Sequence, residues 1–176
     1  MKSIKFILIS TCLILSVFCI VWGTSCTKDT CKTTTCINGG HCSGGACFCP
    51  KGIGGVNCEV IYRDLYNFSY KGSGSDNNGK TYPDNIMTFT SVGDTAYSQM
   101  QFSWNNNGVG LVSLALTLTN NTPSGSSFTL GSVSVDTFTY TGSGSFVNNL
   151  SASVTLIESH PHSPSVTISL HNFLKQ

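Results

Sequence analysis

The sequence predicts a mainly β protein that consists of a small disulfide-rich module followed by an antiparallel β-sandwich or barrel. Charged residues make up only 10% of the 176 residues, and Ser, Thr, Asn and Gly supply the polarity instead. Long exposed helices depend on Lys and Glu, so this composition favours strands joined by turns. Six cysteines between Cys31 and Cys58 indicate the module, and apolar residues that alternate with polar ones beyond Glu59 indicate the strands.

The charge balance excludes some classes of partner. The formal net charge is +1. A surface that binds nucleic acid is strongly basic, so we expect no nucleic-acid partner. The chain also lacks an acidic run of the kind that forms a solvating tail.

Residues 1–25 have the three-part pattern of an export signal. Lys2 and Lys5 form a basic start, an apolar run covers residues 6–22, and Gly23-Thr24-Ser25 supplies small residues. A retained membrane anchor is the alternative, because the apolar run is just long enough to cross a bilayer. We expect a cleaved signal because the small residues follow at once.

Cys26 follows these small residues directly. The chain has nine cysteines, and Cys12 and Cys19 lie in the signal, so seven remain (nine minus two). A group attached to Cys26 would leave six, which can pair completely. A free thiol at Cys26 is the alternative, and it is less suitable in an oxidising compartment.

Small residues followed by a cysteine resemble the processing site of bacterial lipoproteins, in the looser form found in Bacteroidota. The resemblance implies that Cys26 carries a lipid and that residues 26–30 form a tether. It also implies an exported chain that is anchored at the bacterial outer membrane or cell surface. Thr27-Lys28-Asp29 is similar to the short tag that directs some of these lipoproteins to the cell surface.

Residues 31–58 are too short and too polar to fold around a core of their own. Disulfides therefore have to stabilise the module, each by about 2–4 kcal/mol, because they restrict the unfolded chain. Spacing alone does not choose among the possible pairings. The six cysteines are Cys31, Cys36, Cys42, Cys47, Cys49 and Cys58.

Two stretches of the module, Cys36-Ile-Asn-Gly-Gly-His-Cys42 and Cys47-Phe-Cys49-Pro-Lys-Gly-Ile-Gly-Gly-Val-Asn-Cys58, resemble an EGF-like domain. Gly39 and Gly40 match a tight turn of that family, which needs positive φ. The resemblance covers only Cys31 to Cys58, and it implies three disulfides. Their pairs are Cys31–Cys42, Cys36–Cys47 and Cys49–Cys58.

Metal binding by the module is an alternative that we do not expect. Cys47, Cys49 and His41 could form a zinc site, but complete disulfide pairing is available in an exported chain. Many EGF-like modules bind calcium, which needs six or more oxygen ligands. Asp29 is the only acidic residue that precedes the first cysteine of the module, and neither Asp nor Asn lies between Cys42 and Cys47. We therefore expect no cofactor and no metal, and we expect the module to be a spacer or an interaction unit.

Residues 59–176 contain no cysteine and are enough for one domain. Period-2 alternation predicts strands that bury one face, and Tyr66, Phe68 and Tyr70 are expected to share such a face. Asn105 to Gly108 is typical of a hairpin turn. The clearest strands cover 66–71, 99–104, 112–119, 150–156 and 166–170, out of about seven expected. The expected loops are 72–80, 120–126 and 158–165.

Two short motifs in this domain have a functional and a structural interpretation. His160-Pro161-His162 could bind a metal, but no third ligand lies near it in the sequence, so we expect an exposed turn. Asp76-Asn77-Asn78-Gly79 resembles part of a calcium loop but lacks the spaced acids and the closing Glu, so we again expect a turn. Asp94-Thr95-Ala96 resembles the O-glycosylation motif of Bacteroidota.

No catalytic residues stand out. The chain lacks a nucleophile elbow, a phosphate-binding loop, a zinc-protease motif and a dinucleotide fingerprint. No pair is evident among the carboxylates of the domain, which are Glu59, Asp64, Asp76, Asp84, Asp94, Asp136 and Glu158. Six aromatic residues could form a sugar-stacking platform, although strand positions would half-bury most of them. They are Tyr62, Tyr66, Tyr70, Tyr97, Trp104 and Tyr140.

These observations favour a surface-anchored, non-enzymatic lipoprotein in which an EGF-like spacer presents a β-rich binding domain. The expected partners are the membrane, through the lipid anchor, and a protein or glycan ligand. A glycan-binding or adhesion module is one alternative. A hydrolase on the β-domain is the other, and it would require two carboxylates that face each other across a pocket.

Overall fold

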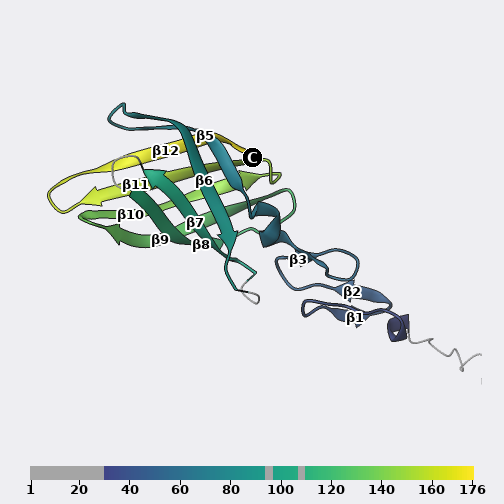
Figure 1. The fold of residues 1–176 in the computed structure, drawn as a ribbon. Helices are drawn as coiled ribbons and strands as arrows, with labels where there is room; N and C mark the ends of the chain where they lie inside the picture. The colour runs from purple at the N-terminus through teal and green to yellow at the C-terminus, as the bar shows by residue number, and fades with distance from the viewer. Residues whose placement is uncertain (1–29, 94–96, 107–109) are drawn as a thin grey trace, which may run out of the picture.

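The computed structural model describes residues 30–93, 97–106 and 110–176 and shows a small module followed by a β-barrel (Figure 1). The predictions for residues 1–25, Cys26 and Asp94-Thr95-Ala96 lie outside the described residues. In the part of the chain that the structure describes, no helix is both long enough and apolar enough to cross a bilayer.

The module is built from short elements and three disulfides. The 3-10 helix η1 (Thr30–Lys32) is followed by the hairpin of β1 (His41–Ser43) and β2 (Ala46–Phe48), and then by β3 (Ile53–Gly54). The disulfides join Cys31–Cys42, Cys36–Cys47 and Cys49–Cys58, which are the pairs that the EGF resemblance implies. Disulfides of this kind form and persist in oxidising compartments, so they indicate an extracellular or similarly oxidising location.

Eight antiparallel strands close into a barrel in which each strand pairs with its neighbours in the sequence. The last strand pairs with the first, so no strand edge is left open. The strands that the alternation predicted are therefore present, and they form a barrel. They are β5 (Ser69–Asp76), β6 (Thr81–Ser91), β7 (Gln99–Asn106), β8 (Gly110–Leu118), β9 (Gly125–Val135), β10 (Phe138–Val147), β11 (Ser151–His160) and β12 (Ser163–Lys175).

The barrel interior is filled by large apolar side chains. Every second residue of a strand points inward, and an eight-stranded barrel is just wide enough for its side chains to fill it. Ring contacts connect the interior across strands, as between Phe89 and Phe146, whose centroids are 4.7 Å apart. The largest fully buried side chains include Trp104, Tyr66, Tyr70, Tyr140, Phe89, Phe102, Phe128 and Phe173.

Several predicted boundaries were wrong. Residues 72–80 were expected to be a loop, but β5 extends to Asp76. Residues 158–165 were also expected to be a loop, but β11 extends to His160 and β12 begins at Ser163. The expected loop at 120–126 ends earlier, because β9 begins at Gly125. The sequence prediction missed strand residues that are glycines or that flank a short turn.

The shared face of Tyr66, Phe68 and Tyr70 was also wrong. Tyr66 belongs to the 3-10 helix η2 (Tyr62–Tyr66) and not to a strand. Tyr66 and Tyr70 are both fully buried, whereas Phe68 is exposed between them. The helical turn changes the direction of the chain before β5 begins, so the period-2 rule does not extend across it.

The module is joined to one end of the barrel by an ordered junction. β3 pairs with β4 (Val60–Ile61), which leads directly into η2. Tyr66 closes this end of the barrel, because its ring stacks on Phe146 at 4.5 Å and its hydroxyl donates to the Thr122 carbonyl. We call this the proximal end, and the module lies beyond it in Figure 1. The opposite, distal end carries the turns at 77–80, 136–137 and 161–162.

Candidate binding sites

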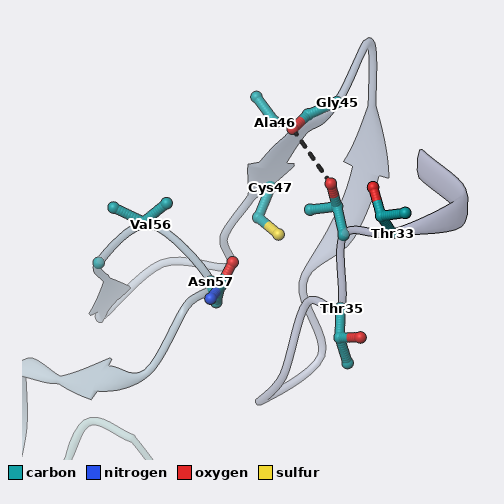
Figure 2. A pocket seen from close by; sticks show the side chains of 9 residues that line it. Thr33, Thr35, Gly45, Ala46, Cys47, Val56 and Asn57 are labelled. Atoms are coloured by element: carbon teal, nitrogen blue, oxygen red, sulfur yellow. Dashed lines mark hydrogen bonds between the residues drawn. The ribbon is translucent and has the colours of Figure 1, made fainter. Parts of the chain in front are cut away.

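A groove in the module is the first candidate site. Its volume is about 620 Å³, within the range of small-molecule and peptide sites. Figure 2 shows β2 on one side and the segment from Thr33 to Thr35 on the other, with the Cys47 side chain pointing between them. The groove is lined by Thr33, Thr34, Thr35, Gly45, Ala46, Cys47, Gly55, Val56 and Asn57.

The residues that line the groove offer hydrogen-bonding groups and carry no charged side chain. None of its lining residues has an ionisable side chain apart from Cys47, which is held in a disulfide. Thr34 Oγ1 donates to the Gly45 carbonyl at 3.4 Å, and this bond joins the two sides of the groove (Figure 2). Val56 adds an apolar edge, since 82% of it is exposed. The arrangement suits a neutral ligand with its own donors and acceptors.

A polar cluster at the distal end of the barrel is the second candidate site. Glu158 is only 9% exposed, and its carboxylate has a partner for each oxygen. Tyr140 donates to Oε2 at 2.6 Å, and His160 Nε2 lies 3.1 Å from Oε1. These contacts satisfy a carboxylate that would otherwise be costly to bury.

A second carboxylate and tyrosine lie at the same end. Tyr82 donates from its hydroxyl to Asp76 Oδ2 at 3.1 Å. Burial, together with the hydrogen bond to Asp76 and the nearby charge of Glu158, raises the pKa of Tyr82 to about 12. Burial on its own raises the pKa of Asp76, but hydrogen bonds from the backbone of Lys80 and Asn78 and from Tyr82 outweigh it and lower that pKa.

Apolar side chains surround this cluster and reach the surface. Phe138 packs edge-on against His160, with ring centroids 4.6 Å apart. Trp104 is fully buried beneath and donates to Asn85 Oδ1 at 3.3 Å. Among the described residues, the partly buried hydrophobic side chains that pack against the core lie toward this end, and they are Val133, Val135, Phe138 and Val166. The barrel core is therefore covered at the proximal end and reaches the surface at the distal end.

The fold brings several sequence candidates together at the distal end. Asp76 to Gly79 forms the β5–β6 turn, in which Asp76 Oδ1 accepts the backbone N–H groups of Asn78 and Lys80 at 2.9 Å. His160-Pro161-His162 spans the β11–β12 turn. Asn77 connects the two regions through hydrogen bonds with Thr167. Within the described ranges, no group of three or more His, Cys, Asp or Glu residues could hold a metal ion.

Four of the six aromatic residues that could have formed a platform are more deeply buried than the half-buried positions that we expected for most of them. Tyr66, Tyr70, Trp104 and Tyr140 are fully buried inside the barrel, because they occupy inward positions. Tyr62 and Tyr97 are half-buried near the junction with the module. The exposed row of rings that would favour stacking on a sugar is absent from these six residues.

Sequence reasoning missed the importance of Glu158, although a signal for it exists. Ala152, Val154 and Leu156 point into the barrel, and Glu158 continues the same period-2 phase. A carboxylate at the next inward position needs buried partners. Tyr140 supplies one of them from the neighbouring strand, where it is paired with Glu158.

Comparisons with known proteins gave no relative. No protein-family model matches the chain, and no curated protein and no solved structure matches it.

Proposed function

We propose that this chain is an exported, surface-anchored binding protein without enzymatic activity. Its module is an EGF-like spacer, and its barrel carries a ligand at the distal end. The observation that supports this proposal is the difference between the two barrel ends. Tyr66 fills the proximal end, to which the module is joined, whereas partly buried apolar side chains that pack on the core and the Glu158 cluster lie toward the distal end.

Attachment through a lipid on Cys26 belongs to the same proposal. All six cysteines of the module are paired, so Cys26 has no partner left in the chain once residues 1–25 are removed. A lipid there would hold the module near the membrane and direct the distal end outward. A single acyl chain binds membranes only marginally, and we therefore expect more than one acyl chain.

Intact mass of the protein isolated from membranes, before and after reduction, tests the attachment. We expect a chain that begins at Cys26, carries a diacyl or triacyl group and gains six hydrogen atoms (two for each of its three disulfides) on reduction. An unmodified Cys26, or retention of residues 1–25, would contradict the anchor.

Ligand screening tests the binding function. We would probe a glycan array and then follow any hit by amide chemical shifts of labelled protein. We expect the shifts to cluster at the distal end and the affinity to fall at least tenfold in Phe138→Ala. Val147→Ala is the matched control, because Val147 is an exposed apolar residue at the proximal end of the same strand. Equal losses in both variants, or turnover of a glycan during the assay, would reject this proposal.

A further inference from the structure

We propose that the groove of the module binds an extended, uncharged peptide segment of another protein by adding it as a strand to β2. Peptides that bind in this way gain affinity from main-chain hydrogen bonds and specificity from alternate side chains. This inference concerns the module and stands independently of any ligand at the distal end of the barrel.

The hairpin geometry decides which backbone groups of β2 are free. Gly44 and Gly45 connect β1 to β2, and both have positive φ, at 62° and 87°, as a two-residue type I′ turn requires. The residues that flank such a turn, Ser43 and Ala46, form the hydrogen-bonded pair of the ladder. Hydrogen-bonded and non-hydrogen-bonded pairs alternate in an antiparallel ladder. Cys42 and Cys47 are therefore a non-hydrogen-bonded pair.

The N–H and C=O groups of Cys47 consequently point away from β1. Within the described ranges β2 pairs only with β1, and no hydrogen bond of the Cys47 backbone to another described residue is present. One residue thus offers a donor and an acceptor on the same free strand edge. An extended peptide supplies the complementary pair, since one residue of an antiparallel partner exchanges both bonds.

The groove chemistry favours a peptide over a glycan. Cys47 is one of the lining residues, so a strand added to β2 lies within reach of the groove. The Thr33, Thr35 and Asn57 side chains can bond further peptide groups, and Val56 can cover a small apolar side chain. Sugar sites usually present a ring face for stacking, and no aromatic residue lines this groove. The lack of charge in the lining favours an uncharged segment.

A selection experiment with the full chain, oxidised and folded, tests the proposal. Linear seven-residue peptides displayed on phage would be selected on the protein, and the enriched peptides would be synthesised. We expect uncharged, β-prone peptides whose binding shifts the amide signals of Cys47 and its neighbours. N-methylation of the peptide amide that donates to Cys47 should weaken binding about tenfold, which corresponds to one lost main-chain hydrogen bond. N-methylation of the next amide, which points away from β2, should change it less than twofold.

Two protein variants provide a matched comparison. Val56→Asp adds a negative charge at the groove and should weaken binding at least tenfold. Ser43→Asp adds the same charge to β1, on a residue that does not line the groove, and should change binding less than threefold. Both residues are exposed, so both variants should keep the disulfides, as checked by intact mass.

Three outcomes would overturn the proposal. The first is failure of the selection to enrich any peptide. The second is enrichment of peptides that shift barrel amides or that show no alternation in the N-methylation series. The third is binding that occurs only after residues 26–29 are deleted, because the groove would then belong to the tether of the same chain.

Discussion

Two tyrosine hydroxyls inside the barrel have opposite environments. Tyr140 donates to the buried carboxylate of Glu158 at 2.6 Å, whereas the hydroxyl of Tyr70 is buried with no hydrogen-bond partner among the described residues. A hydrogen bond to a charged group contributes about 1.5–3 kcal/mol, and an unsatisfied buried donor costs about 1–3 kcal/mol. The same Tyr→Phe change should therefore have opposite effects at the two positions.

We expect Tyr140→Phe to lower the free energy of unfolding by about 1.5–3 kcal/mol. We expect Tyr70→Phe to leave it unchanged or to raise it by about 1 kcal/mol. Urea unfolding followed by tryptophan fluorescence measures both, and each variant is the control of the other because both side chains are fully buried. Equal destabilisation of the two variants would show that ring packing, and not the hydroxyl, determines the result.

The buried tyrosines also determine how the stability of the protein depends on alkaline pH. Burial raises the pKa of Tyr70 to about 12, with a smaller contribution from Tyr66, and burial with the Asp76 hydrogen bond raises that of Tyr82 to about 12. An unfolded tyrosine ionises at about pH 10. Between these values the folded state holds more protons than the unfolded state, so the free energy of unfolding should fall as pH rises from about 10 to about 12.

Unfolding at pH 9 and at pH 11.5 measures this loss of stability. Tyr82→Phe should reduce the slope between the two pH values, because it removes one of the late-titrating groups. Tyrosinate absorbance near 295 nm should show Tyr70 and Tyr82 ionising late, together with Tyr66, whose pKa burial also raises. A slope that is identical in the wild type and in Tyr82→Phe would contradict the assignment.

At the scale of the elements, glycine explains why the alternation pattern predicts some strands and misses others. The alternation in 112–119 predicts β8 closely, since Val112, Leu114, Leu116 and Leu118 are all buried. In β5, by contrast, Gly72 and Gly74 occupy the positions where apolar residues would mark a strand. A Cβ at Gly74 would lie 2.6 Å from the Ser169 carbonyl oxygen, so the barrel requires glycine there. A Lys-Gly-Ser-Gly-Ser stretch therefore reads as a loop although it is a strand.

The sequence also does not predict how the candidate sites are assembled. The motif residues Asp76 and His160 are visible in the sequence, but their meeting at one end depends on the pairing of β12 with β5. That pairing joins the first strand of the barrel to the last one, which are far apart in the sequence, and no local sequence pattern predicts it. The groove depends on the disulfide connectivity, which the EGF resemblance implies and spacing alone does not determine.

Gly144 in β10 provides an element-scale prediction. An added Cβ would lie 2.3 Å from the Ser153 carbonyl oxygen and 2.4 Å from Phe128 Cζ. Gly144→Ala should therefore force the two strands apart or displace the ring, and overpacking of this kind costs about 1–3 kcal/mol. Gly131→Ala is the control, because its Cβ would meet nothing closer than 3.4 Å. Thermal unfolding should show a lower midpoint for Gly144→Ala alone, and equal midpoints for the two variants would reject the steric explanation.

At the scale of the whole molecule, the junction determines how the module and the barrel are held together. Arg63 is buried, and its guanidinium donates to the carbonyl groups of Val92 and Gly93 at 3.1 and 2.9 Å. Its neighbour Asp64 accepts a hydrogen bond from Ser91 at 2.8 Å. These contacts join η2 to the end of β6, so they fix the segment that leaves the module against the proximal rim. Tyr66 then fills the barrel end from the same helix.

Reduction of the disulfides should separate the stability of the two parts. The module buries few apolar residues, chiefly Ile53 and Cys58, so its fold depends on its three disulfides. The barrel has its own apolar core and no cysteine after Cys58. Under native conditions with a reducing agent, we expect the amide signals of residues 31–58 to collapse toward unfolded values while those of β5 to β12 remain dispersed.

The contacts at the junction determine which residues stay folded with the barrel when the module unfolds. Tyr66 and Arg63 follow the last cysteine in the sequence and contact the barrel directly, so their signals should stay with the barrel after reduction. In a Tyr66→Ala variant the barrel loses a buried ring, which costs about 3–5 kcal/mol, whereas the oxidised module should keep its signals. Amide spectra and thermal unfolding of wild type and variant, each oxidised and reduced, measure both effects. Loss of the barrel signals on reduction of the wild type would show that the two parts fold as one unit and would contradict this division.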